Sequence, residues 1–215
     1  MKRFKLPDRR LVRQTCDADP ILFYYKPIVG YFFQTRIERC LELIPNTGFR
    51  RILEIGTGSG VMIPSLAEFA DQITAIDIHD ELSSLREIKN TYSDSCNIGF
   101  ARADVVRLPF ASGSFDMAVA ISVFEHFEQL DSVLKETVRV LKPGGLLLAG
   151  IPVKSSTMSA LFKLIGYSLD DLHPSSHTKI IDSIKKHFSV IKTNSLTLFP
   201  KGPEMYFGML ASVDI

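Results

Sequence analysis

The chain has 215 residues, of which 46% are hydrophobic and 23% charged, and its formal net charge is +1. This composition is that of a folded globular protein with one large domain, or one domain and an appendage. A charge near zero gives no overall attraction to nucleic acid, and no apolar run is long enough to span a bilayer. We therefore expect no nucleic-acid partner and no integral membrane segment.

The cysteines are few and scattered, at Cys16, Cys40 and Cys96. Their odd number and irregular spacing fit neither a disulfide framework nor a metal site. The N-terminus also lacks the apolar core and cleavage site of a secretory signal. These features predict a reducing, cytoplasmic setting.

The first 48 residues are expected to form an arm and a helix. Residues 1–20 are polar and rich in Lys and Arg, which is typical of a solvated arm. Residues 21–44 carry apolar side chains at helical intervals, with charged side chains mostly on the other face. The segment 45–48 contains Pro and Gly and ends this helix.

Residues 51–60 form the stretch around which the rest of the chain is organised. A short apolar run ends at Gly56 and predicts a buried strand, and glycine then recurs at Gly58 and Gly60. Residues 61–69 have helical spacing. Glycine lets the backbone approach a ligand where a Cβ atom would collide, and a helix N-terminus offers unpaired N–H groups. Strand, glycine turn and helix therefore predict a ligand-binding corner.

Strands and helices alternate beyond this corner, which predicts a parallel sheet with helices on both faces. Strands are expected at 73–76, 98–103, 115–121 and 146–151, helices at 81–90 and 130–141, and a turn at 142–145. After Pro152 the pattern predicts helices at 155–165 and 177–187 and strands at 188–199 and 205–213. The short connection between these last two strands requires them to be antiparallel.

Polar side chains stand at the ends of several predicted strands, where ligands bind in open α/β sheets. Asp77 ends the second strand, Asp104 the third, and the segment 122–126 follows the fourth. A carboxylate at Asp77 can accept hydrogen bonds from both hydroxyls of a ribose. Each acid taken alone is equally well explained as a helix N-cap.

The order of these features is more informative than any one of them. It runs Glu54-x-Gly-x-Gly-x-Gly, Asp77, Asp104, the segment 108–116 and Leu-Lys-Pro-Gly-Gly at 141–145. Over roughly residues 50–152 it resembles the class I S-adenosylmethionine (SAM)-dependent methyltransferases of the type 11 group. The resemblance implies a Rossmann-like, mostly parallel sheet of seven strands, ordered 3-2-1-4-5-7-6 with the last strand antiparallel. It also implies SAM as the cofactor and S-adenosylhomocysteine (SAH) as its product.

The same resemblance implies a set of cofactor-binding residues. They are Glu54, Gly56, Thr57, Gly58, Ser59, Gly60, Asp77, Ile78, Asp104, Val105, Ser122 and Val123. The glycine loop would pass under the methionine part of SAM, and Asp77 would hold the ribose. Asp104 and Val105 would bond the adenine, and Ile78 would pack on its face. The last two residues of the set would line the methyl-donor side.

Specificity in this family usually comes from additions before the first strand and after the fifth, here residues 1–48 and an insertion at 153–176 of the domain 49–215. Tyr24 and Tyr25 in the first addition are candidate acceptor contacts, with core packing as the alternative. His173 is a candidate in the second. His126 is a candidate acceptor contact and general base, although it is equally a structural histidine. The catalytic residues are otherwise unknown.

Two other functions remain open alongside methyl transfer to a small molecule, a lipid or a glycan precursor. An NAD(P)-dependent oxidoreductase would use the same corner, but its fingerprint places the third glycine where Val61 stands. A non-catalytic SAM-binding protein would keep the loop and both acids. The chain lacks Asn/Asp-Pro-Pro-Tyr after the fourth strand, which disfavours the amino groups of bases and glutamine amides as acceptors. No metal is expected, because His173, His177 and His187 have no zinc-ligand spacing.

Overall fold

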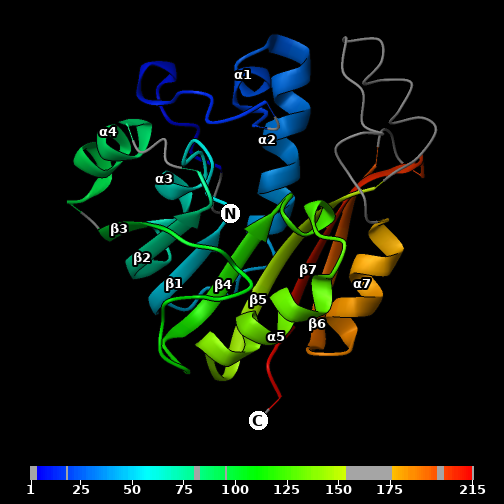
Figure 1. The fold of residues 1–215 in the computed structure, drawn as a ribbon. Helices are drawn as coiled ribbons and strands as arrows, with labels where there is room; N and C mark the ends of the chain where they lie inside the picture. Colours follow the sequence, from blue (N-terminus) through cyan, green and yellow to red (C-terminus); the bar gives the residue numbers. More distant parts are fainter. Residues whose placement is uncertain are drawn as a thin grey trace.

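The computed structural model describes residues 4–17, 19–79, 83–94, 96–153, 176–197 and 201–214. They build one seven-stranded sheet in the order β3-β2-β1-β4-β5-β7-β6 (Figure 1). The strands are β1 (Phe49–Ile55), β2 (Ala70–Asp77), β3 (Asn97–Arg102), β4 (Phe115–Ile121), β5 (Leu141–Pro152), β6 (Ser189–Thr197) and β7 (Glu204–Ser212). β7 is antiparallel to both of its neighbours, and every other pair is parallel. The predicted fold class and strand order are confirmed.

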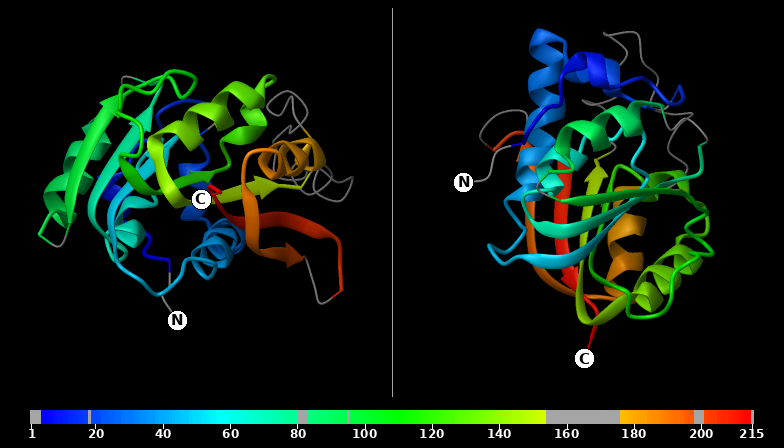
Figure 2. Two further views of the ribbon diagram at one scale, coloured as in Figure 1. Left: turned by 90° about the horizontal axis from the view of Figure 1, so that it is seen from below. Right: turned by 90° about the vertical axis from the view of Figure 1, so that its left-hand side faces the viewer.

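Helices cover both faces of the sheet (Figure 2). They are η1 (Arg9–Leu11), α1 (Ile21–Tyr24), α2 (Pro27–Leu41), α3 (Ile63–Leu66), α4 (Ser83–Tyr92), η2 (Phe124–His126), α5 (Leu130–Val140) and α7 (His177–Lys185). One core joins the sheet to α2, α3 and α4, and a second core joins it to α5 and α7. Ile52 lies in the first core and Leu53 in the second, because successive side chains of a strand point to opposite faces. The central strands are therefore apolar throughout, as strands buried on both sides must be.

The N-terminal helix differs from the single helix expected at 21–44. It breaks after Tyr24, and α2 begins at Pro27 with Lys26 extended as its N-cap. Proline disfavours the helical conformation in the residue before it and is well suited to the first position of a helix. The break lets α1 lie across the top of α2, at the carboxyl ends of the parallel strands (Figure 1).

Two further elements differ from expectation. The helix expected at 61–69 shrinks to the four residues of α3, since the backbone already extends into β2 at Ala70. The turn expected at 142–145 is a bulge inside β5, because the pairs Phe115–Leu141 and Met117–Leu146 leave these four residues unpaired with β4. The expected helix at 155–165 lies outside the described residues.

The N-terminal arm packs against the domain through its apolar side chains, while Arg9, Arg10 and Arg13 stay exposed, as expected of a solvated basic stretch. Phe4 and Val12 are buried in the core, and the Lys5 backbone N–H donates to Ser65 Oγ at 2.8 Å. With Leu6 and Leu11 packed against the same core, these side chains hold the arm on the domain. Among the described residues, no helix combines the length and the apolar character needed to cross a bilayer.

Candidate cofactor and acceptor site

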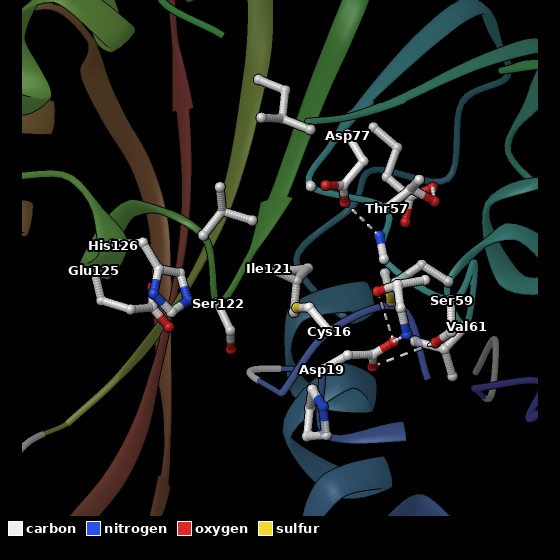
Figure 3. A pocket seen from close by; sticks show the side chains of 18 of the residues that line it. Cys16, Asp19, Thr57, Ser59, Val61, Asp77, Ile121, Ser122, Glu125 and His126 are labelled. Carbon is white, nitrogen blue, oxygen red and sulfur yellow. Dashed lines mark hydrogen bonds between the residues drawn. The ribbon is translucent and has the colours of Figure 1, made fainter. Parts of the chain in front are cut away.

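A cavity of about 740 Å³ opens at the carboxyl ends of β1, β2 and β4. The glycine loop after β1 forms one wall, and the residues after β4 form the opposite wall. Figure 3 shows Ser122 and Glu125 across the cavity from Thr57. The arm, Tyr24 of α1 and the middle of α2 complete the lining of the cavity. Such a position is where open α/β sheets bind ligands.

The glycine loop requires glycine for two separate reasons. Gly56 and Gly58 have φ angles of 70° and 50°, in the left-handed region that side chains with a Cβ avoid. A Cβ on Gly56 would also lie 2.5 Å from Cγ2 of Val123, so this residue brings the first wall against the second. Gly60 also has a positive φ, of 78°, but it does not line the cavity and lies against Leu85 and Ile88.

Asp77 ties the glycine loop to the end of β2. Its Oδ2 accepts from the Gly58 N–H at 2.7 Å, and its Oδ1 accepts from the Ile78 and His79 N–H groups at 2.7 and 3.3 Å. The described part of α4 begins only at Ser83, so the bonds that Asp77 accepts are not those of a helix N-cap. Its carboxylate lines the cavity and retains lone pairs for further donors.

Glu54 supports the same loop from beneath. It is buried, and Thr57 Oγ1 donates to its Oε2 at 2.8 Å. Burial raises the pKa of Glu54 to about 8, although the hydrogen bond from Thr57 opposes that shift. The loop thus rests on a carboxyl group that is mostly protonated at neutral pH.

Ile78, Asp104 and Val105 lie along the edge of the cavity beyond Asp77. The Val106 N–H donates to Asp104 Oδ1 at 3.0 Å, which fixes this carboxylate at the end of β3. Val105 is buried, whereas the Ile78 side chain is 58% exposed. An exposed apolar side chain beside two fixed acids is well suited to cover one face of a flat ring.

The arm contributes residues that sequence reasoning did not single out. Asp19 Oδ2 accepts from the N–H and the hydroxyl of Thr15, both at 3.1 Å, and its Oδ1 accepts from the Ile21 N–H at 3.0 Å. Ser59 Oγ lies 3.5 Å from the same carboxylate, so Asp19 fastens the arm over the glycine loop (Figure 3). Burial raises the pKa of Asp19. The sequence carries one local signal for the role of Asp19 in holding the arm, namely an acidic residue directly before Pro20.

A buried polar network forms the wall opposite the glycine loop. Arg36 on α2 donates through Nη1 to Ser122 Oγ at 3.1 Å and through Nη2 to Tyr24 Oη at 2.9 Å. Ser122 has a φ of 57° and lies 2.8 Å, oxygen to oxygen, from the Tyr206 hydroxyl. The guanidinium also lies 4.5 Å from the centre of the Phe33 ring. The network joins α1, α2, β4 and β7 at the cavity.

Glu125 and His126 follow this network on η2, and both line the cavity. Glu125 is buried, and burial raises its pKa to about 8 while the charge of Arg36 opposes the shift. The sequence analysis considered only the histidine of this pair. Burial of a carboxyl next to the cavity cannot be read from a local pattern.

The structure separates the remaining candidates. Tyr24, Ser122, Val123 and His126 all line the cavity. Tyr25 faces the arm instead: its hydroxyl donates to the Pro7 carbonyl at 2.8 Å, so it is not brought to the cavity. His173 lies outside the described residues.

Residues 53–149 match a family model described as a methyltransferase domain. Over 123 residues the chain is 34% identical to the sterol 4-C-methyltransferase strm-1 of Caenorhabditis elegans, covering 56% of this chain and 35% of that protein. It is 32% identical over 98 residues to a ubiquinone biosynthesis O-methyltransferase of Xanthomonas oryzae pv. oryzae, covering 45% of this chain and 41% of that protein. The chain therefore spans well under half the length of these relatives.

The fold is also that of the N-methyltransferase NodS of Bradyrhizobium japonicum, solved in complex with SAH. The TM-score is 0.67 at 18% identity, and the alignment covers 95% of this chain and 96% of that one. At this identity the likeness shows the fold alone. Together with the family match over residues 53–149 and the order of the glycine loop, Asp77 and Asp104, it indicates that the matched part of the chain is a SAM-dependent methyltransferase domain.

Proposed function

We propose that the chain binds SAM in this cavity and transfers its methyl group to a small-molecule acceptor, leaving SAH. The observation that carries the proposal is the joint position of Asp77 and the glycine loop. The carboxylate is fixed by the Gly58 N–H and still lines the cavity, as the holder of a ribose must be. A residue with a Cβ at Gly56 would collide with Val123 and close the passage between the two walls.

The residues of the cavity fit the charges of this cofactor. SAM supplies a sulfonium that is already activated for displacement of its methyl group. Asp77 and Asp104 lie where the nucleoside would be held, and Asp19 borders the loop expected to lie under the methionine part. Arg36 lines the opposite wall and offers a cation for a carboxylate. Alignment of acceptor, methyl carbon and sulfur supplies most of the rate in such a reaction, potentially about 7–11 kcal/mol.

The acceptor side is proposed to be formed by residues 1–48, by the insertion 153–176 and by the residues after β4. Tyr24 and the rings of Phe32 and Phe33 support this assignment, because they line the cavity away from the glycine loop. The names of the relatives refer to a sterol and to ubiquinone biosynthesis, which supports an acceptor with a large apolar part. His126 is the proposed base where the acceptor starts protonated, a role worth about 10²–10⁴-fold.

The proposal includes a cytoplasmic location and excludes nucleic acid as the acceptor. The cysteines are all free, and Cys40 and Cys96 are buried, as suits a reducing compartment. The net charge of +1 offers no general attraction to a polyanion.

Calorimetric titration tests the proposal against its alternatives. SAM and SAH should each bind one site per chain, and NAD should not bind. Tight binding of NAD without SAM would favour the oxidoreductase. Binding of SAM without transfer of its methyl group to any small molecule in a cell extract would favour a non-catalytic protein.

A further inference from the structure

Large apolar side chains are unevenly distributed over the surface. Among the described residues, the exposed ones at the carboxyl end of the sheet are Leu22, Ile28, Tyr31, Ile78 and Val106, and those elsewhere are Val190 and Ile191 on β6. Ile78 borders the cavity, so the cofactor accounts for its exposure. The side chains of α1 and the start of α2 have no such explanation.

Ile28 and Tyr31 are the most exposed apolar side chains of the described residues, at 87% and 74%. They are three positions apart on α2 and therefore lie on the same face of the helix. Leu22 on α1 is 42% exposed and precedes them at the same end of the molecule. We call these three side chains the α1–α2 corner. Leaving them in water forfeits the burial free energy that a partner surface would supply.

The chain around the α1–α2 corner is basic. Residues 1–31 contain seven Lys and Arg against three Asp, although the whole chain carries only +1. Arg9, Arg13 and Lys26 are exposed among the described residues. The Arg9 guanidinium lies 5.5 Å from the centre of the Tyr25 ring and the Lys26 ammonium 4.7 Å from that of Phe23, so each charge lies beside an aromatic ring at α1.

Exposed apolar side chains on a basic stretch of chain are the pattern of a protein surface that enters the headgroup region of an anionic bilayer. The partner must offer an apolar region beside negative charge. An anionic bilayer does so, with an apolar interior beneath charged headgroups, and a nucleic acid does not. The same end of the molecule carries the cavity, lined by Pro20, Tyr24 and Phe32.

We propose that the α1–α2 corner docks on an anionic lipid bilayer, with Ile28 and Tyr31 inserted among the headgroups and the basic residues on the lipid phosphates. Docking places the end of the molecule that carries the cavity against the bilayer, where an apolar acceptor would be dissolved. Docking does not depend on methyl transfer and is measured without it.

The test is cosedimentation of the full chain with vesicles of phosphatidylcholine, with and without phosphatidylglycerol. Binding to the mixed vesicles should be at least about tenfold tighter, since each basic side chain near an anionic surface contributes severalfold. Raising the salt concentration should weaken it. The double variant Ile28→Asp/Tyr31→Asp should lose at least about tenfold in vesicle affinity, because both substitutions put charge where apolar contact is needed.

Val190→Asp/Ile191→Asp is the matched control. It introduces the same two charges on exposed apolar side chains of β6, and vesicle binding should stay within about twofold of wild type. Thermal unfolding and sedimentation velocity of every variant report folding and self-association. The proposal is overturned if wild type ignores the anionic vesicles or if both double variants lose binding equally. It is also overturned if the α2 variant only changes the oligomeric state, which would make the corner an interface between copies.

Discussion

Asp77 offers the sharpest test of how the cavity holds its cofactor. Asp77→Ala removes the acceptor for the Gly58, Ile78 and His79 N–H groups and, in the proposed complex, for two ribose hydroxyls. A hydrogen bond to a charged group is worth about 1.5–3 kcal/mol, and part of each loss is recovered by water. The affinity for SAH should therefore fall about tenfold to several hundredfold.

Titration calorimetry with SAH measures this loss, and thermal unfolding separates it from damage to the fold. The melting temperature should drop only modestly, because Asp77 lies at a strand end and the two cores are untouched. Asp131→Ala on α5 is the control acid: it pairs with Lys135 and His187 and does not line the cavity, so its SAH affinity should match wild type. An Asp77→Ala protein that binds SAH as tightly as wild type would refute the reasoning and leave Asp77 as a brace of the loop alone.

Three further predictions concern the walls of the cavity. Burial raises the pKa of Glu125 from 4.5 to about 8. The contribution of this side chain to the free energy of unfolding is therefore fully present below pH 4.5 and is lost as the pH rises toward 8. Across this window the free energy of unfolding of wild type, measured in urea, should fall by up to about 1.4 kcal/mol per pH unit relative to that of Glu125→Gln. Parallel pH profiles of the two proteins would contradict this. Gly56→Ala should lower both the melting temperature and the affinity for SAH, because the added Cβ collides with Val123 and the backbone has a φ of 70°. Gly48→Ala, which has open space around it, should lower neither. Asp19→Ala should speed amide hydrogen exchange of the arm around Thr15, and unchanged exchange would show that Asp19 does not fasten it.

The fold and the cofactor wall could be predicted because their signals are local. The strand before Gly56 is an unbroken apolar run, and the acids Asp77 and Asp104 each follow another such run. Parallel strands then bring these ends together at one edge of the sheet without any further information. The order of the strands in the sheet followed from the family resemblance.

The polar network of the opposite wall could not be predicted, although Ser122 in it was, because its contacts join distant parts of the chain. Tyr206 on the last strand meets Ser122 across 84 positions, and Arg36 reaches the same serine across 86. Arg36 itself sits in a helix whose pattern is that of an ordinary amphipathic segment. Tyr24 and Tyr25 are neighbours of one residue type, and only the break before Pro27 sends one to the cavity and the other to the arm.

Transfer of a labelled methyl group tests the central claim most directly. The chain is incubated with methyl-labelled SAM and a fractionated cell extract, and the label is followed into products. Label should appear in a small, organic-soluble product, and far less of it with Asp77→Ala at the same SAM concentration. A chain that binds SAM and yet moves no label into any fraction would contradict the claim.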